Sequence, residues 1–120
     1  MKFILLTLLF FGSQFLIGQE TNLYKETMKS FKEYFNAQDV DAVYDLYTPE
    51  MQEAMTKNGI SRFVVSCFKQ FGSLEEISFV ERSEEEDVNT YKGKFEKTSF
   101  NIEVQLSTNG KISSLQLQSL

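Results

Sequence analysis

The chain has 120 residues with 17 acidic and 12 basic side chains, a net charge of −5, one cysteine and no histidine. The excess of acid argues against a nucleic-acid partner and against binding to an anionic membrane surface, because both attract basic patches. A single cysteine cannot form an internal disulfide, and the absence of histidine removes the commonest general base.

Residues 1–18 have the layout of a secretory signal peptide. Lys2 precedes an apolar run over residues 3–11, and the segment then becomes more polar. An uncleaved membrane anchor is the alternative, but it needs roughly 20 consecutive apolar residues, and the stretch at 12–14 interrupts this run. Cleavage leaves residues 19–120, which we expect to form a single domain in a secreted or periplasmic protein.

Two helices are predicted next, with a sharp corner between them. Over residues 21–38 the large apolar side chains recur every three or four positions, as on the buried face of an amphipathic helix. Asp39 is a preferred N-cap residue and opens a second, short helix. Its inward face would carry Val40, Val43, Tyr44 and Tyr47.

A third and a fourth helical segment are predicted to follow. The sequence TPE at positions 48–50 combines a capping hydroxyl, a proline and an acid in the first turn, so a helix should begin there. The sequence NG at 58–59 predicts a left-handed C-cap that ends it. Ser61 would then cap a fourth helix, which has a dense apolar stripe and ends at Gly72.

Beyond Gly72 the apolar residues recur every second position, which indicates strands. Four segments show this alternation, around positions 77–79, 91–95, 100–106 and 115–117. The acidic run at 84–87 predicts an exposed turn, and Asn109-Gly110 predicts a tight primed hairpin turn. The order of elements predicts an α+β fold in which N-terminal helices pack on one face of a four-stranded antiparallel sheet.

Several stretches together resemble a known superfamily. They are YFNAQDVDAVYDLYTPEM at 34–51, Phe71-Gly72, YKGKFEK at 91–97 and NGKISSLQL at 109–117. The chain is similar to the nuclear-transport-factor-2-like (cystatin-like) superfamily, and within it to small secreted bacterial domains of unknown function. Such domains are common in Bacteroidetes and occur alone or ahead of a β-lactamase-type serine hydrolase. The resemblance implies a curved sheet wrapped over a long helix, often with a pocket, and it supplies no catalytic residues.

The candidate catalytic and metal-binding groups have simpler explanations. Asp41 and Asp45 fall on the solvent side of the second helix, and Glu103 falls on the wet face of its strand. Glu81 shares the inward parity of its strand but lies at the strand end. Cys67 lies within an apolar helical stripe, as a buried core cysteine would. The acids at 84–87 lack the spacing of a calcium loop, so we expect no metal and no cofactor.

Tyrosines are the best candidates for a binding site. Tyr44, Tyr47 and Tyr91 fall on core-facing stripes, and an inward Gly93 beside Phe95 leaves room on the sheet. They would line a pocket between the second helix and the sheet, although core packing alone also explains them.

The pattern favours a non-catalytic domain that binds a small apolar or amphipathic ligand or a partner protein. The alternatives are a small pocket enzyme of the isomerase or dehydratase type and an accessory module of a cell-wall serine hydrolase. A buried carboxylate within reach of a tyrosine would favour the enzyme. The open face of the sheet is polar, so we expect a monomer or a weak dimer. It would carry Ser78, Arg82, Lys92, Lys94, Glu96, Asn101, Glu103 and Gln105.

Overall fold

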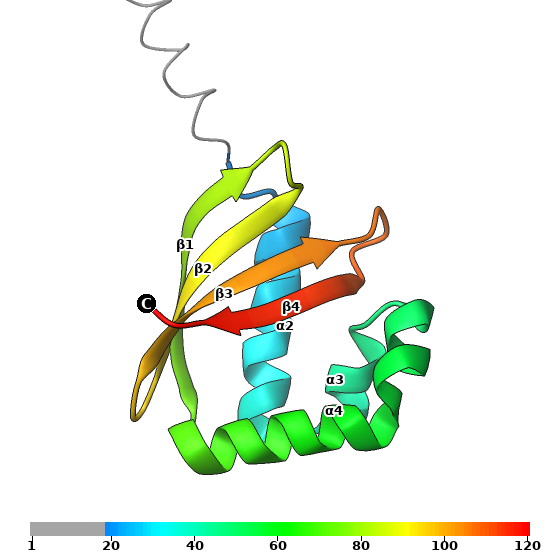
Figure 1. The fold of residues 1–120 in the computed structure, drawn as a ribbon, viewed down its shortest axis with the longest axis vertical. Helices are drawn as coiled ribbons and strands as arrows, with labels where there is room; N and C mark the ends of the chain where they lie inside the picture. Colours follow the sequence, from blue (N-terminus) through cyan, green and yellow to red (C-terminus); the bar gives the residue numbers. More distant parts are fainter. Residues whose placement is uncertain (1–18) are drawn as a thin grey trace, which may run out of the picture.

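A computed structural model of the chain describes residues 19–120, so the predicted signal peptide lies outside the described residues. Its elements are α2 (Asn22–Ala37), α3 (Val40–Asp45), α4 (Pro49–Phe71), β1 (Leu74–Ser83), β2 (Val88–Phe95), β3 (Ser99–Leu106) and β4 (Ile112–Gln118). The strands form one antiparallel sheet in the order β1-β2-β3-β4 (Figure 1). The predicted α+β fold, with helices against a curved four-stranded antiparallel sheet, is confirmed.

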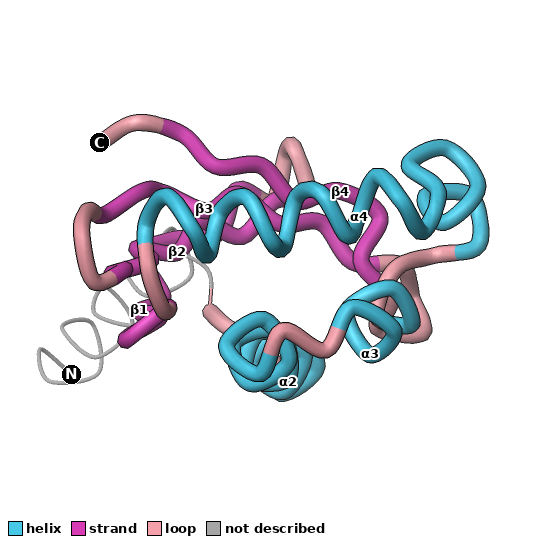
Figure 2. Tube along the Cα trace, turned by 90° about the horizontal axis from the view of Figure 1, so that it is seen from below, coloured by secondary structure: helices cyan, strands magenta, loops and turns pink. Residues whose placement is uncertain are grey.

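The helices cover one face of the sheet and one of its ends. Figure 1 shows α2 standing along the sheet while α4 runs across its lower end, and Figure 2 shows α3 beside α2. Three of the predicted helix starts are capped by side chains, since Thr21, Asp39 and Thr48 each accept a backbone N–H of the first turn. Gln38 takes the left-handed conformation (φ 57°) that ends α2.

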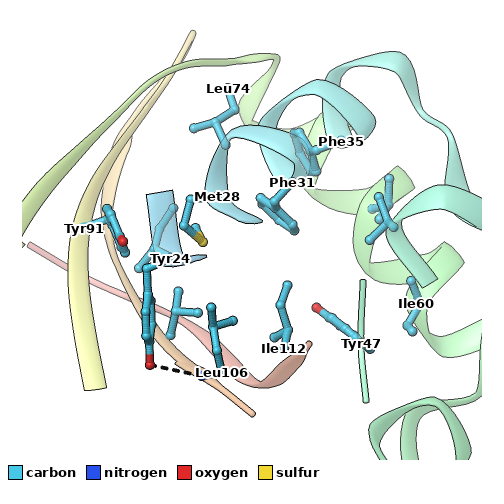
Figure 3. Packing of buried hydrophobic residues seen from close by; sticks show 14 of the residues in the cluster. Tyr24, Met28, Phe31, Phe35, Tyr47, Ile60, Leu74, Tyr91, Leu106 and Ile112 are labelled. Atoms are coloured by element: carbon cyan, nitrogen blue, oxygen red, sulfur yellow. Dashed lines mark hydrogen bonds between the residues drawn. The ribbon is translucent and has the colours of Figure 1, made fainter. Parts of the chain in front are cut away.

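The core lies between α2 and the inner face of the sheet (Figure 3). Met28, Phe31 and Phe35 of α2 are each no more than 2% exposed. Phe35 meets Phe95 of β2 edge to face, with ring centroids 5.7 Å apart. Tyr24, at the start of the same stripe, accepts the buried N–H of Leu106 at 3.1 Å through its hydroxyl oxygen.

Helix α4 breaks at Thr56, three residues before the position that the sequence indicates. Thr56 has φ 65° and ψ 162°, and its hydroxyl accepts the N–H of Gly59 at 3.2 Å. It is therefore the cap of the second part of α4, and the predicted C-cap at Asn58-Gly59 is wrong, because both residues lie inside the helix. A β-branched residue at positive φ costs about 1–3 kcal/mol, which the capping bond offsets in part.

A register shift in β1 reverses the predicted orientation of its last residues. Phe79 pairs with Tyr91, but after an irregularity Arg82 pairs with Asn89. Arg82 therefore faces inward, where its Nη1 donates to the buried Asn89 Oδ1 at 2.9 Å. Glu81 pairs with Thr90 on the open face and is exposed. The predicted outward placement of Arg82 is therefore wrong, whereas Glu81, in spite of its inward parity, is exposed as a residue near the strand end would be.

The β3–β4 hairpin is present, but its turn is wider than predicted. Of the predicted pair Asn109-Gly110, only Gly110 has a positive φ (83°), and Ser107 N–H donates to Lys111 C=O at 2.8 Å across the turn. Gly110 also lies against α2, since its carbonyl accepts the hydroxyl of Thr27 at 3.2 Å. Contact with α2 therefore shapes this turn.

Candidate functional site

A groove of about 310 Å³ lies between α2 and the β1 edge of the sheet. Its apolar lining is Met28 from α2, Ile77 and Phe79 from β1, and Tyr91 from β2. Figure 3 shows Met28 and Tyr91 facing each other from helix and sheet. Because β1 is an edge strand, Ile77 and Phe79 are only partly covered, whereas Met28 is 2% exposed. The groove is thus a gap at the edge of the core, where side chains do not fill the space between α2 and β1.

Backbone pairing sets the floor of the groove. Ile77 lies opposite Gly93 and Phe79 opposite Tyr91, all on the inner face of the sheet. The rings of Phe79 and Tyr91 meet edge to face, with centroids 5.6 Å apart at 66°. This contact fixes an aromatic surface at the middle of the groove.

The hydroxyl of Tyr91 both donates and accepts a hydrogen bond. It donates to Glu20 Oε2 at 2.8 Å and accepts Asn89 Nδ2–H at 3.2 Å. Burial raises the pKa of the Tyr91 phenol, and the contact with Glu20 also raises this pKa, whereas the bond from Asn89 opposes the shift. The phenol therefore stays protonated at neutral pH and acts as a donor.

Behind Tyr91 a chain of polar groups crosses the inner face of the sheet. Asn89 is fully buried and accepts from Arg82, whose guanidinium lies over the Tyr24 ring at 5.5 Å. Arg82 also pairs with Asp87 and with Glu84. Within residues 19–120, no buried side-chain nitrogen or oxygen lacks a partner. These hydrogen bonds hold Tyr91 in place.

Charged side chains rim the groove. Lys25, Lys29 and Lys32 line it from α2, and Glu20 and Glu76 line it from the other sides. The lysines recur at a spacing of four and then three residues, so they share one side of the helix. An apolar floor with a charged rim suits an amphipathic molecule.

Two of the predicted site tyrosines lie away from the groove. Tyr44, on α3, is half-buried with the Lys57 ammonium 5.5 Å from its ring centroid. Tyr47 is 3% exposed and pairs with the start of β4 through Ile112. Burial, together with the nearby Cys67, raises the pKa of Tyr47 to about 12. Tyr47 packs as a core side chain (Figure 3).

The room that Gly93 was predicted to leave is occupied. An added Cβ at Gly93 would lie 2.5 Å from Ile102 Cδ1 and 3.5 Å from Leu74 Cδ1. Phe95 is 4% exposed and contacts the rings of Phe35 and Phe71. Of the five predicted site residues, only Tyr91 lines the groove, which runs beside the first described helix and not between the second helix and the sheet.

The remaining predicted groups behave as structural or solvated side chains. Asp41 forms an exposed ion pair with Lys57 at 2.6 Å, and Asp45 is exposed. Cys67 is half-buried against the core, and burial raises the pKa of its thiol, which disfavours the nucleophilic thiolate. In the part of the chain that the structure describes, no three His, Cys, Asp or Glu side chains are grouped to hold a metal ion.

A second hollow of about 210 Å³ lies on the opposite, open face of the sheet. Glu86, Glu103 and Gln105 line it together with Val88 and two residues of β4. Its charged lining is acidic, and Gln105 already donates to the backbone of Glu86 at 3.0 Å. This hollow lacks the apolar floor of the groove.

Over residues 19–120, the fold and the groove define a small α+β domain with an open, partly apolar groove beside α2. The chain belongs to the family described as protein of unknown function (DUF3887), whose model matches residues 29–115. Neither a curated protein nor a solved structure matches the chain. Over residues 19–120, no helix has the length and apolar character needed to cross a bilayer.

Proposed function

We propose that this chain is a secreted or periplasmic, non-catalytic binding domain of the nuclear-transport-factor-2-like type, which holds a small amphipathic ligand in the groove beside α2. The observation that carries the proposal is the apolar floor formed by Met28, Ile77, Phe79 and Tyr91 under a charged rim. The helix-then-sheet order supports the superfamily, and the apolar N-terminal run supports export.

The size of the groove limits the ligand. Binding pockets for small molecules occupy about 300–1,000 Å³, and the groove, at about 310 Å³, falls at the lower end. Its floor offers hydrocarbon and one phenol, so affinity comes mainly from apolar burial. A ligand with one short apolar chain or one or two rings fits this surface.

Binding of the neutral fluorescent probe N-phenyl-1-naphthylamine tests the proposal. We expect saturable binding at one site, and we expect Ile77→Gln to weaken it about tenfold, because an aliphatic side chain is worth about 1.5–3 kcal/mol when fully buried and Ile77 is half-buried. The protein has no tryptophan, so its own emission does not obscure the probe. Circular dichroism spectra and the midpoints of urea unfolding establish that the variant is folded.

Val80→Gln is the matched control. Val80 is the next exposed aliphatic residue on β1, 50% exposed, and does not line the groove. Probe binding should be unchanged in this variant. No saturable binding by the wild type, or an equal loss in both variants, would remove the groove as the site.

A second function, a small enzyme, is favoured by one contact. A carboxylate within reach of a tyrosine is the arrangement expected of an isomerase-like site, and Glu20 accepts the Tyr91 hydroxyl at 2.8 Å. Glu20 is half-buried, not buried, and the bond to Tyr91 occupies one of its oxygens. The pair has the residue types of a general base and an oxyanion donor, with the base open to solvent.

Deuterium exchange separates the enzyme from the binding domain. Acetophenone in heavy water would exchange its methyl protons if Glu20 removed a proton while Tyr91 stabilised the enolate. Under the binding-domain proposal we expect no exchange above background. Exchange that Glu20→Gln abolishes and Glu76→Gln preserves would establish the enzyme instead.

A further inference from the structure

We infer that the ligand of the groove is an amphipathic anion, whose apolar part lies on the floor and whose charged group lies against the lysines of α2. This inference rests on the proposed function and adds the charge of the ligand to it. The rim residues that carry it are Lys25, Lys29 and Lys32.

The three lysines are available to a ligand. Within residues 19–120 the ion pairs involve Lys57 and Arg82, and none of the three groove lysines has a carboxylate oxygen within 4.0 Å. Lys25 and Lys29 are exposed and Lys32 is half-buried along the helix. Three ammonium groups on one side of α2 repel one another, and an anion between them reduces this repulsion.

The two carboxylates of the rim accept hydrogen bonds from neutral hydroxyls. Glu20 accepts from Tyr91, and Glu76 accepts the Ser78 hydroxyl at 3.1 Å. Both carboxylates keep their charge in these contacts, so three ammonium groups stand against two carboxylates around the groove, whereas the whole chain has a net charge of −5. A local field opposite in sign to the net charge selects ligands by charge.

The occupant that fits this arrangement is a single dissolved amphiphile. A groove of about 310 Å³ takes one short chain beneath its rim, whereas a bilayer presents a broad anionic surface. The excess of acid over the whole chain, with 17 acidic against 12 basic residues, disfavours such a surface. The lysines thus bind a headgroup at the groove, and the protein does not dock on the membrane.

Calorimetric titration with three probes that share one chain tests the charge preference. Decanoate is expected to bind about tenfold more tightly than decanol or decyltrimethylammonium, and added salt should weaken only the decanoate complex. Decanol bound as tightly as decanoate would overturn the inference and leave the proposed function standing. If none of the three probes and no neutral fluorescent probe binds, the proposed function fails as well.

Two triple variants with the same change in net charge show whether the preference for decanoate depends on the groove lysines. Lys25→Gln, Lys29→Gln and Lys32→Gln combined should bring decanoate affinity down to that of decanol and leave decanol affinity unchanged. The control combines Lys69→Gln, Lys92→Gln and Lys97→Gln, three exposed lysines outside the groove, and it changes the net charge equally. Equal loss of decanoate binding in both sets would show a general charge effect and refute the site.

Vesicles provide the last arm of the test. Sedimentation with phosphatidylglycerol vesicles should leave the protein in the supernatant under conditions in which decanoate binds. Lysine-dependent sedimentation without binding of dissolved decanoate would assign the lysines to a membrane surface and overturn the inference.

Discussion

Replacing Asn36 with alanine is expected to lower the free energy of unfolding by about 2–4 kcal/mol. The side-chain amide of Asn36 binds both polar groups of the Leu74 backbone: Oδ1 accepts the N–H at 2.7 Å and Nδ2 donates to the C=O at 2.9 Å. Leu74 is fully buried where the chain leaves α4 and enters β1. Removing the amide takes these partners from the N–H and the C=O of the buried Leu74.

The control for this prediction is Asn58→Ala. Asn58 is exposed within α4, and the change should alter stability by no more than about 0.5 kcal/mol, apart from a small gain in helix propensity. Urea unfolding measures both variants, and the midpoint should fall for Asn36→Ala with an unchanged slope. A midpoint equal to that of the control would mean that the Asn36 amide does not tie α2 to β1.

The class of fold could be predicted from the sequence because it depends on periodicity. The change from a period of about 3.6 to a period of 2 after Gly72 separates the helices from the strands. Caps at Asp39 and Thr48 fixed two helix starts, and the structure places their hydroxyl or carboxylate oxygens on the backbone N–H groups as expected. Both caps are local signals, and at these two positions the structure keeps them.

The breaks in regularity could not be predicted in the same way. Thr56 adopts a positive φ that a β-branched residue avoids, while the more permissive Gly59 three positions later stays helical. One extra residue between Phe79 and Glu81 exchanges the faces of Glu81 and Arg82. Neither feature leaves a mark in the apolar period.

Only part of the candidate site could be predicted from the sequence. The alternation of apolar residues shows which side chains point inward, but it does not show whether other side chains fill the space beside them. Tyr47 and Gly93 face the core as predicted, but packing fills the space around them. The groove exists because α2 leaves the β1 edge partly uncovered, and Glu20 reaches it from a segment without periodicity. One feature of the sequence could have indicated the groove, namely the lysines that flank Met28 at a spacing of three to four residues. The amphipathic pattern by itself assigns these lysines only to a solvated face of the helix.

Replacing Gly93 with alanine is expected to destabilise the domain by about 1–3 kcal/mol through overpacking, in spite of the small gain from removing a glycine inside a strand. The new methyl group would lie 2.5 Å from Ile102 Cδ1 and 3.1 Å from its Cγ1. Ile102 is fully buried and paired through its backbone with Tyr91 and Leu117, so its main chain cannot retreat from the contact. Urea unfolding of the single variant gives the size of the loss.

A double-mutant cycle identifies the clash as the cause. Ile102→Val alone should cost about 0.5–1.5 kcal/mol, because it removes the buried Cδ1 methyl group. In the double variant that methyl group is absent, so the alanine at position 93 meets no atom closer than Cγ1, and the total loss should be smaller than the sum of the single losses by about 1 kcal/mol. Additive losses would mean that Ile102 does not fill the space at Gly93, which would then be open to a ligand as the sequence alone suggests.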